Sequence, residues 1–255
     1  MDSVSHPMVN TGTRVDFHTH ILPGVDDGSR SASESIQMLR LLGDFGVGAV
    51  VLTPHFYADG DTPERFIARR ARAYSELSDA IQTAESVKLP RMVLGAEVEY
   101  FEGIPCMLEY PELRIGNSGC ILVEMPQSQW SAHMVEDILR LNDSKGFRVI
   151  LAHVERYLFD QKKDIIYTLL ENRVLMQSNA SFFINHSTAR KAIRMLCRGY
   201  IHLLGSDCHN LTSRPPNLGD ACDAIIKHTD EGVLEEVMRG ASHLLRHDFD
   251  IISKG

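Results

Sequence analysis

Seven short apolar runs alternate along this chain with segments whose apolar residues recur at helical spacing, and this alternation restricts the fold more than any other feature. The runs are residues 14–18, 49–53, 91–97, 119–124, 147–153, 174–178 and 200–205. Continuous apolar runs are typical of parallel strands buried on both faces, and parallel strands need crossover connections, usually helices. We therefore expect an α/β domain, with a closed barrel favoured over an open sheet. No glycine-rich nucleotide-binding motif follows any run, which argues against the usual nucleotide-binding folds.

Local signals mark where several helices begin and end. Residues 31–34 have the spacing of a capping box, and the helix that they start is expected to end at Gly43 and Gly46. Thr62 and Pro63 have the character of an N-cap and a first helical residue. Four arginines follow in that second helix and are expected on a solvated face: Arg65, Arg69, Arg70 and Arg72. Further helices are predicted from Ala132, through residues 165–170, and over residues 185–197, 220–227 and 233–245.

Composition narrows the classes of function. The 255 residues are 44% hydrophobic and carry a formal net charge of −8, which argues against a nucleic-acid or anionic-membrane surface. No linker or internal repeat divides the chain, so residues 1–255 are expected to form a single domain, with residues 1–13 flexible. That polar start is not typical of a signal peptide, and no apolar run approaches membrane-span length. Five irregularly spaced cysteines favour free thiols in a reducing compartment, and the cytoplasm is the expected location.

Histidines and carboxylates stand at the ends of six of the seven runs. They are His18, His20, His55, Glu97, Glu124, His153, Asp207 and His209. In a barrel of parallel strands the carboxyl ends of the strands converge on one mouth, where the chemistry of such folds occurs. Any one of these residues could be an ordinary loop residue, but agreement at six strand ends predicts a shared metal-binding cavity.

Six motifs contain these residues. They are His18-Thr19-His20 with Leu22 to Gly28, Thr53-Pro54-His55, Gly95-Ala96-Glu97, Leu122-Val123-Glu124, Ala152-His153-Val154-Glu155-Arg156-Tyr157, and Ser206-Asp207-Cys208-His209. In this order the sequence resembles the PHP (polymerase and histidinol phosphatase) superfamily, and within it the bacterial metal-dependent protein-tyrosine phosphatases of capsule and exopolysaccharide systems. The resemblance covers about residues 14–217. Val154 replaces the usual proline and Cys208 the usual small residue, and neither change removes an expected ligand.

The resemblance implies a distorted TIM-like (β/α)7 barrel of the PHP fold that holds three divalent metal ions. One ion would be held by His18, His20, Glu97 and Asp207. Glu97 would bridge to a second ion, completed by Glu124 and His153. Asp26, His55 and His209 would hold the third. Imidazole and carboxylate ligands suit manganese, zinc or iron, and the resemblance favours manganese.

The resemblance also implies an activity, the hydrolysis of phosphotyrosine in proteins by a hydroxide held between metals. A bacterial tyrosine kinase that regulates capsule or exopolysaccharide synthesis is the expected partner, and the oligomeric state is left open. Arg156 and Arg214 are the expected phosphate-binding residues, because a guanidinium group matches phosphate oxygens with two parallel donors. A salt bridge between Arg156 and Glu155 is the alternative for the first of them.

Three other functions remain open at this point. The chain could be a PHP phosphoesterase for a small molecule such as histidinol phosphate, or a PHP module that binds a partner without catalysis. It could also be an amidohydrolase-type barrel, although that class often bridges its metals with a carboxylated lysine and no lysine stands at a strand end here.

A second phosphatase signature is also present. Residues 208–214 match C-x5-R, the signature of cysteine-dependent tyrosine phosphatases. The loop has no glycine, and Pro215 and Pro216 remove backbone donors where phosphate would need them. Cys208 also alternates away from the face that carries Asp207 and His209, so we expect the match to be accidental. Trp130, after the fourth run, is expected either to wall the site or to pack on a neighbour.

Overall fold

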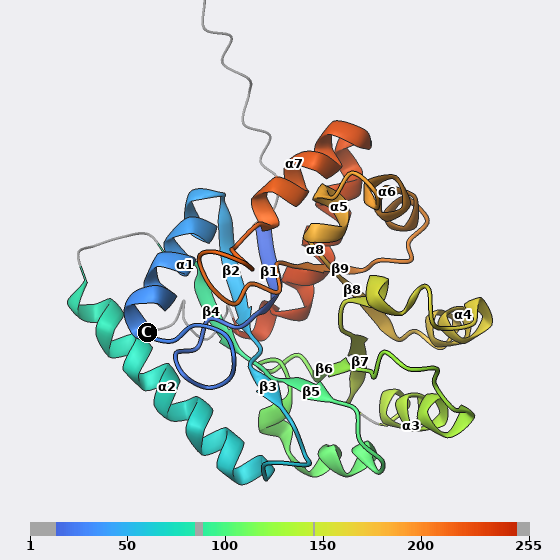
Figure 1. The fold of residues 1–255 in the computed structure, drawn as a ribbon, viewed down its shortest axis with the longest axis horizontal. Helices are drawn as coiled ribbons and strands as arrows, with labels where there is room; N and C mark the ends of the chain where they lie inside the picture. Colours follow the sequence, from blue (N-terminus) through green and yellow to red (C-terminus); the bar gives the residue numbers. More distant parts are fainter. Residues whose placement is uncertain (1–13, 85–88, 145, 249–255) are drawn as a thin grey trace, which may run out of the picture.

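A computed structural model describes residues 14–84, 89–144 and 146–248, so the expectation for residues 1–13 lies outside the described part. Parallel strands form its centre (Figure 1). The main ones are β1 (Arg14–Thr19), β2 (Val47–Leu52), β4 (Arg91–Leu94), β6 (Cys120–Glu124), β7 (Arg148–Leu151), β8 (Leu175–Asn179) and β9 (Leu203–Gly205). Two short strands, β3 (His55–Phe56) and β5 (Glu97–Glu99), continue β2 and β4 beyond a break in each.

The strands close into a distorted barrel. Strands β1, β2 and β4 pair in one sheet, and β3, β5, β6, β7, β8 and β9 pair in the other. The barrel closes where the end of β1 pairs with the residues that follow β9. There the His20 amide donates to the Cys208 carbonyl at 2.9 Å, and the Asp207 amide donates to the His18 carbonyl at 2.8 Å. Pro54, which has no amide hydrogen, separates β2 from β3. The predicted α/β barrel is therefore confirmed, with the distortion concentrated at these breaks.

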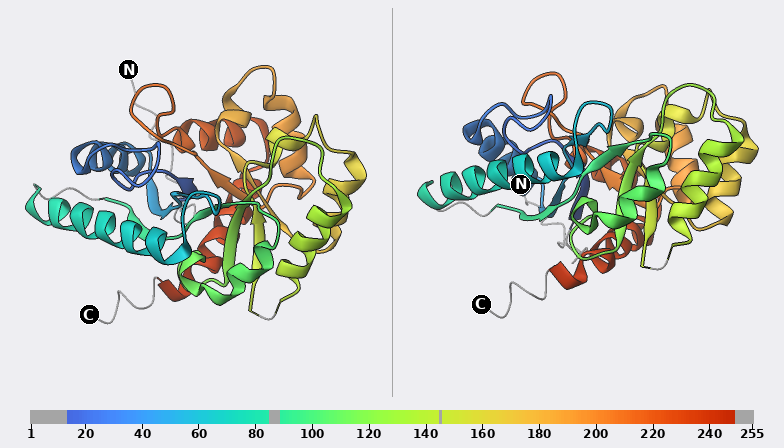
Figure 2. Two further views of the ribbon diagram at one scale, coloured as in Figure 1. Left: turned by 60° about the horizontal axis from the view of Figure 1, so that its bottom comes forward. Right: turned by 90° about the horizontal axis from the view of Figure 1, so that it is seen from below.

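Helices surround the barrel on its outer side (Figures 1 and 2). They are α1 (Ala32–Asp44), α2 (Pro63–Thr83), α3 (Ala132–Asn142), α4 (Lys163–Glu171), α5 (Ser181–Ile184), α6 (Ala189–Cys197), α7 (Leu218–His228) and α8 (Glu231–Leu244). Short turns of 3-10 helix are added by η1 (Ile104–Glu109), η2 (Pro111–Leu113) and η3 (Val154–Tyr157). Within the described ranges, no helix has both the length and the apolar character needed to cross a membrane.

Apolar side chains fill the barrel interior, so the polar ligand-type side chains lie at its carboxyl end. Val15 and Phe17 from β1 pack there with Leu122, Ile150 and other buried apolar side chains of the strands. Ala241 and Leu245, in and just after α8, belong to the same cluster. Figure 2 shows α8, in red, beneath the barrel on the side opposite to the face seen in Figure 1. The interior is thus a packed core that supports the mouth.

The predicted N-caps of α1 and α2 are confirmed. The Ser31 hydroxyl accepts from the Glu34 amide at 3.2 Å, and the Thr62 hydroxyl accepts from the Arg65 amide at 3.4 Å. The Glu34 carboxylate reaches back to the amide of Arg30 rather than to that of Ser31. Each cap satisfies backbone donors that a helix start would otherwise leave free.

Two expectations about helices were wrong. The helix expected over residues 185–197 begins only at Ala189, because the Asn185 side chain accepts from the Ser187 amide and forms a turn between α5 and α6. Arg70 is buried rather than solvated, and its guanidinium donates to the carbonyls of Gly95 and Glu112. It thereby joins α2 to the break between β4 and β5.

His202 generates a prediction about stability. Its Nδ1 accepts from the Met176 amide at 3.0 Å, and burial, with nearby Arg148, lowers its pKa. The folded state therefore binds fewer protons than the unfolded state, so this residue should weaken folding as pH falls below about 6.5. In His202→Asn, which keeps an acceptor near Nδ1, the free energy of unfolding should vary less between about pH 5 and about pH 7.5. Urea unfolding across this range measures both slopes, and identical slopes would contradict the prediction.

Candidate metal centre

Glu97 lies at the centre of the predicted site. Its side chain is fully buried at the start of β5, and its two carboxylate oxygens contact four imidazoles. Oε2 lies 3.0 Å from His18 Nε2, 3.2 Å from His20 Nε2 and 3.1 Å from His55 Nδ1. Oε1 lies 2.9 Å from His153 Nε2. One carboxylate thus joins residues from β1, β3 and the turn after β7.

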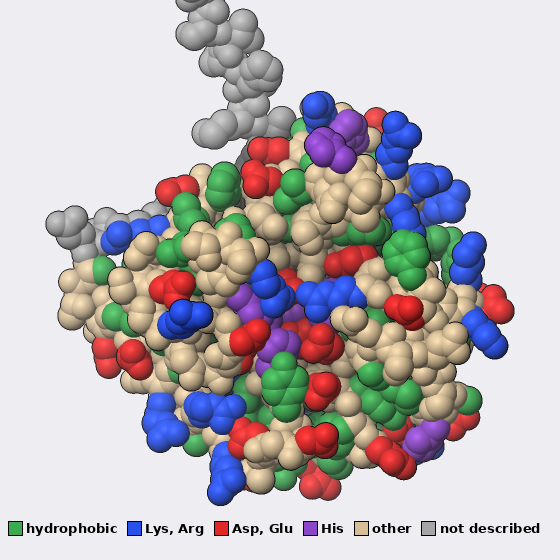
Figure 3. Space-filling model, in the orientation of Figure 1, with side chains coloured by type: hydrophobic (Ala, Val, Ile, Leu, Met, Phe, Trp, Pro, Cys, Tyr) green, Lys and Arg blue, Asp and Glu red, His purple; other side chains and the backbone are tan. Residues whose placement is uncertain are grey.

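The other expected side chains complete the same cluster. Glu124 Oε1 lies 3.2 Å from His153 Nε2, and Asp207 Oδ1 lies 3.4 Å from His20 Nε2. His20 and His209 lie with ring centroids 3.9 Å apart. The structure therefore brings together all eight histidines and carboxylates that the sequence places at strand ends. Figure 3 shows histidine, acidic and basic side chains gathered at the centre of this face.

Ligand-type atoms of described residues converge in three groups, each compact enough to surround a cation. The groups are His18, His20 and Asp207; then His55, Glu97 and Glu124; and then His20, Asp27, His55 and His209. Two features fit a cation better than hydrogen bonds alone. The Nε2 atoms of His18 and His20 face each other at 3.1 Å, and the buried Nδ1 of His55 has no hydrogen-bond partner. Nitrogen and oxygen donors without thiolate suit manganese, zinc or iron.

Electrostatics keep the carboxylates ionised. Burial alone would raise the pKa of Glu97, but His18 and the hydrogen bonds from His153, His18 and His20 hold it well below its usual range. Burial likewise opposes ionisation of Asp207, and the charges of His18 and His20 and a hydrogen bond from His20 hold its pKa low. Glu97 and Asp207 are therefore ionised, as carboxylate ligands of a cation must be.

The pKa values of the histidines in the cluster shift in two directions. Burial lowers the pKa of His55, and it lowers that of His209 to about 4 together with the charges of His20 and Arg214. For His153, hydrogen bonds to Glu124 and Glu97 outweigh burial and raise the pKa to about 9. His55 and His209 are thus neutral at physiological pH, which leaves a lone pair for a cation.

Polar side chains of β8 hold the cluster in place. Gln177 Oε1 lies 3.1 Å from His18 Nδ1 and accepts from the His153 amide at 2.7 Å. Gln177 Nε2 donates to Asn179 Oδ1, and Asn179 Nδ2 donates to Asp207 Oδ2 at 2.8 Å. Because the Nδ1 of His18 is engaged in this way, its Nε2 points into the site. The sequence analysis does not single out Gln177 and Asn179. Two polar residues at alternate positions of a buried strand would have indicated that they share one face and have polar partners there.

The structure places Asp26 differently from expectation. Its Oδ2 lies 2.7 Å from His20 Nδ1 and accepts from the His55 amide at 2.9 Å, and its Oδ1 accepts from the Gly28 amide. The carboxylate that faces His55 and His209 belongs to Asp27, whose Oδ1 lies 3.4 Å from His209 Nε2 and 3.9 Å from His55 Nε2. Asp26 therefore orients His20, and Asp27 takes its place in the third group.

The two arginines lie at the accessible edge of the cluster. Arg156 Nη2 lies 2.6 Å from Asp207 Oδ2, and Arg214 Nη2 lies 2.7 Å from the same oxygen. Both side chains are about one-third exposed, at 32% and 38%. The alternative pairing of Arg156 with Glu155 is not found, because Glu155 Oε1 instead accepts from the Asn179 amide. Two guanidinium groups therefore converge beside the three ligand groups.

Three further residues define what surrounds the site. Cys208 is fully buried among apolar side chains, and burial raises its pKa well above that of an ordinary thiol, so the C-x5-R match is accidental. Trp130 is buried, donates from Nε1 to the Pro126 carbonyl at 2.8 Å and packs edge-on against Tyr157. Of the two alternatives expected for Trp130, packing on a neighbour is therefore confirmed. Tyr57, which we had not identified, is 43% exposed and stacks on His55 at 5.0 Å.

Comparisons with known proteins agree with this geometry. Residues 14–246 match the family described as capsular polysaccharide synthesis, CpsB/CapC. Tyrosine-protein phosphatase CpsB of Streptococcus pneumoniae is 31% identical over 227 residues, covering 84% of this chain and 90% of that protein. Tyrosine-protein phosphatase YwqE of Bacillus subtilis is 26% identical over 240 residues, covering 91% and 92%.

A solved structure gives the same fold. It comes from work on YwqE from Bacillus subtilis and CpsB from Streptococcus pneumoniae, described as unique metal-dependent tyrosine phosphatases. It superposes with a TM-score of 0.81 at 22% identity and covers 91% of this chain and 94% of the other. With the family match extending over nearly all the described residues, the chain belongs to the CpsB/CapC family of capsular polysaccharide synthesis proteins.

Proposed function

We propose that this protein is a metal-dependent phosphatase that hydrolyses phosphotyrosine in proteins. The observation that carries the proposal is the convergence of four imidazoles on the buried Glu97 carboxylate, with two arginines beside it. The family and the names of CpsB and YwqE support the same activity. We further propose that the substrate is a bacterial tyrosine kinase that regulates capsule or exopolysaccharide synthesis, and that the reaction takes place in the cytoplasm.

We propose that the centre holds three divalent ions, most suitably manganese. His18, His20, Glu97 and Asp207 would hold one ion. Glu97, Glu124 and His153 would hold another. His55, His209 and Asp27 would hold the third. When bound, such ions lower the pKa of a water molecule and neutralise charge on phosphoryl oxygens.

The residues of the chain provide the remaining functions. Arg156 and Arg214 offer guanidinium donors to the non-bridging oxygens of a phosphoryl group, since both already converge on one carboxylate oxygen. Tyr57 offers an exposed ring beside His55, against which an aryl group can stack. A tyrosine leaving group, with a pKa of about 10, needs little assistance from a general acid.

The activity is tested with chelator-stripped protein that has been reconstituted with manganese. A phosphotyrosine peptide and histidinol phosphate serve as parallel substrates, with Cys208→Ala as the control for cysteine chemistry. Release of phosphate from the peptide should require metal and should be unchanged in Cys208→Ala. Activity on histidinol phosphate alone would reject the proposed substrate, and metal-free activity that is lost in Cys208→Ala would reject the mechanism.

The roles of the adjacent aspartates give a separate prediction. Asp27→Asn should bind one equivalent of manganese fewer than the wild type, because it removes the carboxylate that faces His55 and His209. Asp26→Asn should keep the full number at saturation but bind about 10–100-fold more weakly, since it loosens His20. Elemental analysis and chelator competition measure number and affinity. If Asp26→Asn loses the equivalent and Asp27→Asn keeps it, the assignment is wrong.

A further inference from the structure

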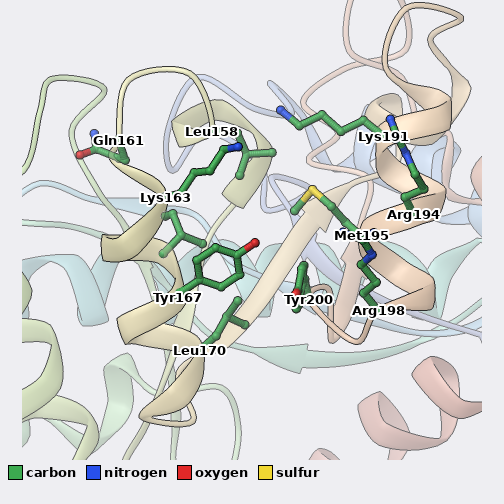
Figure 4. A pocket seen from close by; sticks show the side chains of 11 residues that line it. Leu158, Gln161, Lys163, Tyr167, Leu170, Lys191, Arg194, Met195, Arg198 and Tyr200 are labelled. Atoms are coloured by element: carbon green, nitrogen blue, oxygen red, sulfur yellow. The ribbon is translucent and has the colours of Figure 1, made fainter.

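A groove between α4 and α6 lies outside the metal centre (Figure 4). Its volume is about 330 Å³, and we call it the α4–α6 groove. The floor is apolar and aromatic, formed mainly by Tyr167, Met195 and Tyr200, with the two tyrosine rings edge to face at 5.7 Å. Four basic side chains line it: Lys163, Lys191, Arg194 and Arg198.

The groove is positively charged on a protein whose net charge is negative. No Asp or Glu is among its lining residues, although the whole chain has 34 acidic and 26 basic residues. Within the described part of the chain, none of the four cations forms an ion pair with a carboxylate. The charge is therefore available to an anionic partner.

The spacing of the cations indicates the shape of that partner. Lys191 and Arg194 in α6 and Arg198 at its C-cap occur at intervals of three and four residues, which places them in a row along one side of this helix. Seven residues of helix span about 10 Å, the length of about three residues of extended chain. A single phosphate or another small anion would contact only part of this row. An extended acidic segment with an apolar side chain for the floor matches its full length.

A short stretch of chain connects the metal centre to the groove. Leu158, which lines the groove, follows Arg156 of the centre by two positions. Phe159 comes next, is 83% exposed and lies under Lys191 Nζ at 4.5 Å from its ring centroid. A chain whose phosphotyrosine lies in the centre can therefore continue past Phe159 into the groove.

We propose that the α4–α6 groove binds an acidic segment of the protein substrate, close in sequence to the phosphotyrosine. This inference rests on the proposed function and adds a preference to it. Substrates with Asp or Glu and an apolar side chain beside the phosphotyrosine bind more tightly than neutral ones. The metal centre performs the hydrolysis, and the groove selects the protein.

Two phosphotyrosine peptides of equal length test this, one with an acidic and apolar extension and the other with a neutral polar extension. For the wild type, kcat/KM should be about tenfold higher for the acidic peptide, and added salt should reduce this ratio. In the double variant Arg194→Glu/Arg198→Glu the ratio should fall to about one or below. Both arginines are exposed, so the fold should be retained.

Two controls separate the groove from the metal centre. Arg65→Glu/Arg72→Glu makes the same charge change at exposed positions of α2 and should keep the wild-type ratio. Hydrolysis of p-nitrophenyl phosphate should be the same in all three proteins, which confirms an intact centre. Equal rates on both peptides in the wild type, or a ratio unchanged in Arg194→Glu/Arg198→Glu, would overturn the role of the groove alone. Absence of metal-dependent hydrolysis of either peptide would overturn the proposed function and the inference with it.

Discussion

The buried carboxylate of Glu97 holds together the carboxyl end of the barrel. An isolated charge in a protein interior is strongly unfavourable, so it needs partners that are held in position. Here four imidazoles provide them, and they come from β1, β3 and the turn after β7. His55 and Glu97 are register partners in the pairing of β3 with β5, so the strand pairing that forms the sheet also brings this imidazole to the carboxylate.

The breaks that distort the barrel lie directly before two residues of the same cluster. Pro54 interrupts the second strand just before His55, and Gly95 and Ala96 interrupt the next just before Glu97. A Cβ atom on Gly95 would lie 3.0 Å from the Ile115 side chain, so a larger residue there would require Ile115 to shift. Arg70 donates to the Gly95 carbonyl from α2 and holds this irregular backbone in place. The barrel is thus regular where it packs its interior and irregular where it presents its ligands.

The sequence predicted the barrel and the histidines and carboxylates at its strand ends because both follow from simple periodicities. Parallel strands read as apolar runs, and their carboxyl ends must meet. Residues whose position depends on loop conformation or long-range packing were not predictable in this way. Asp26 and Asp27 are adjacent in a turn, and the contacts of Asp26 with His20 and with the amides of Gly28 and His55 leave Asp27 to face His209. Arg70 and Gln177 belong to no motif, and their roles depend on partners far along the chain.

Anomalous diffraction from crystals of the manganese-loaded protein, recorded near the manganese absorption edge, tests whether the cluster around Glu97 is a preformed metal centre. We expect one peak enclosed by His18, His20 and Asp207, one between Glu97, Glu124 and His153, and one facing His55, His209 and Asp27. The first two peaks should share the Glu97 carboxylate. Manganese bound elsewhere, or no peak within coordination distance of Glu97, would contradict a preformed metal centre there.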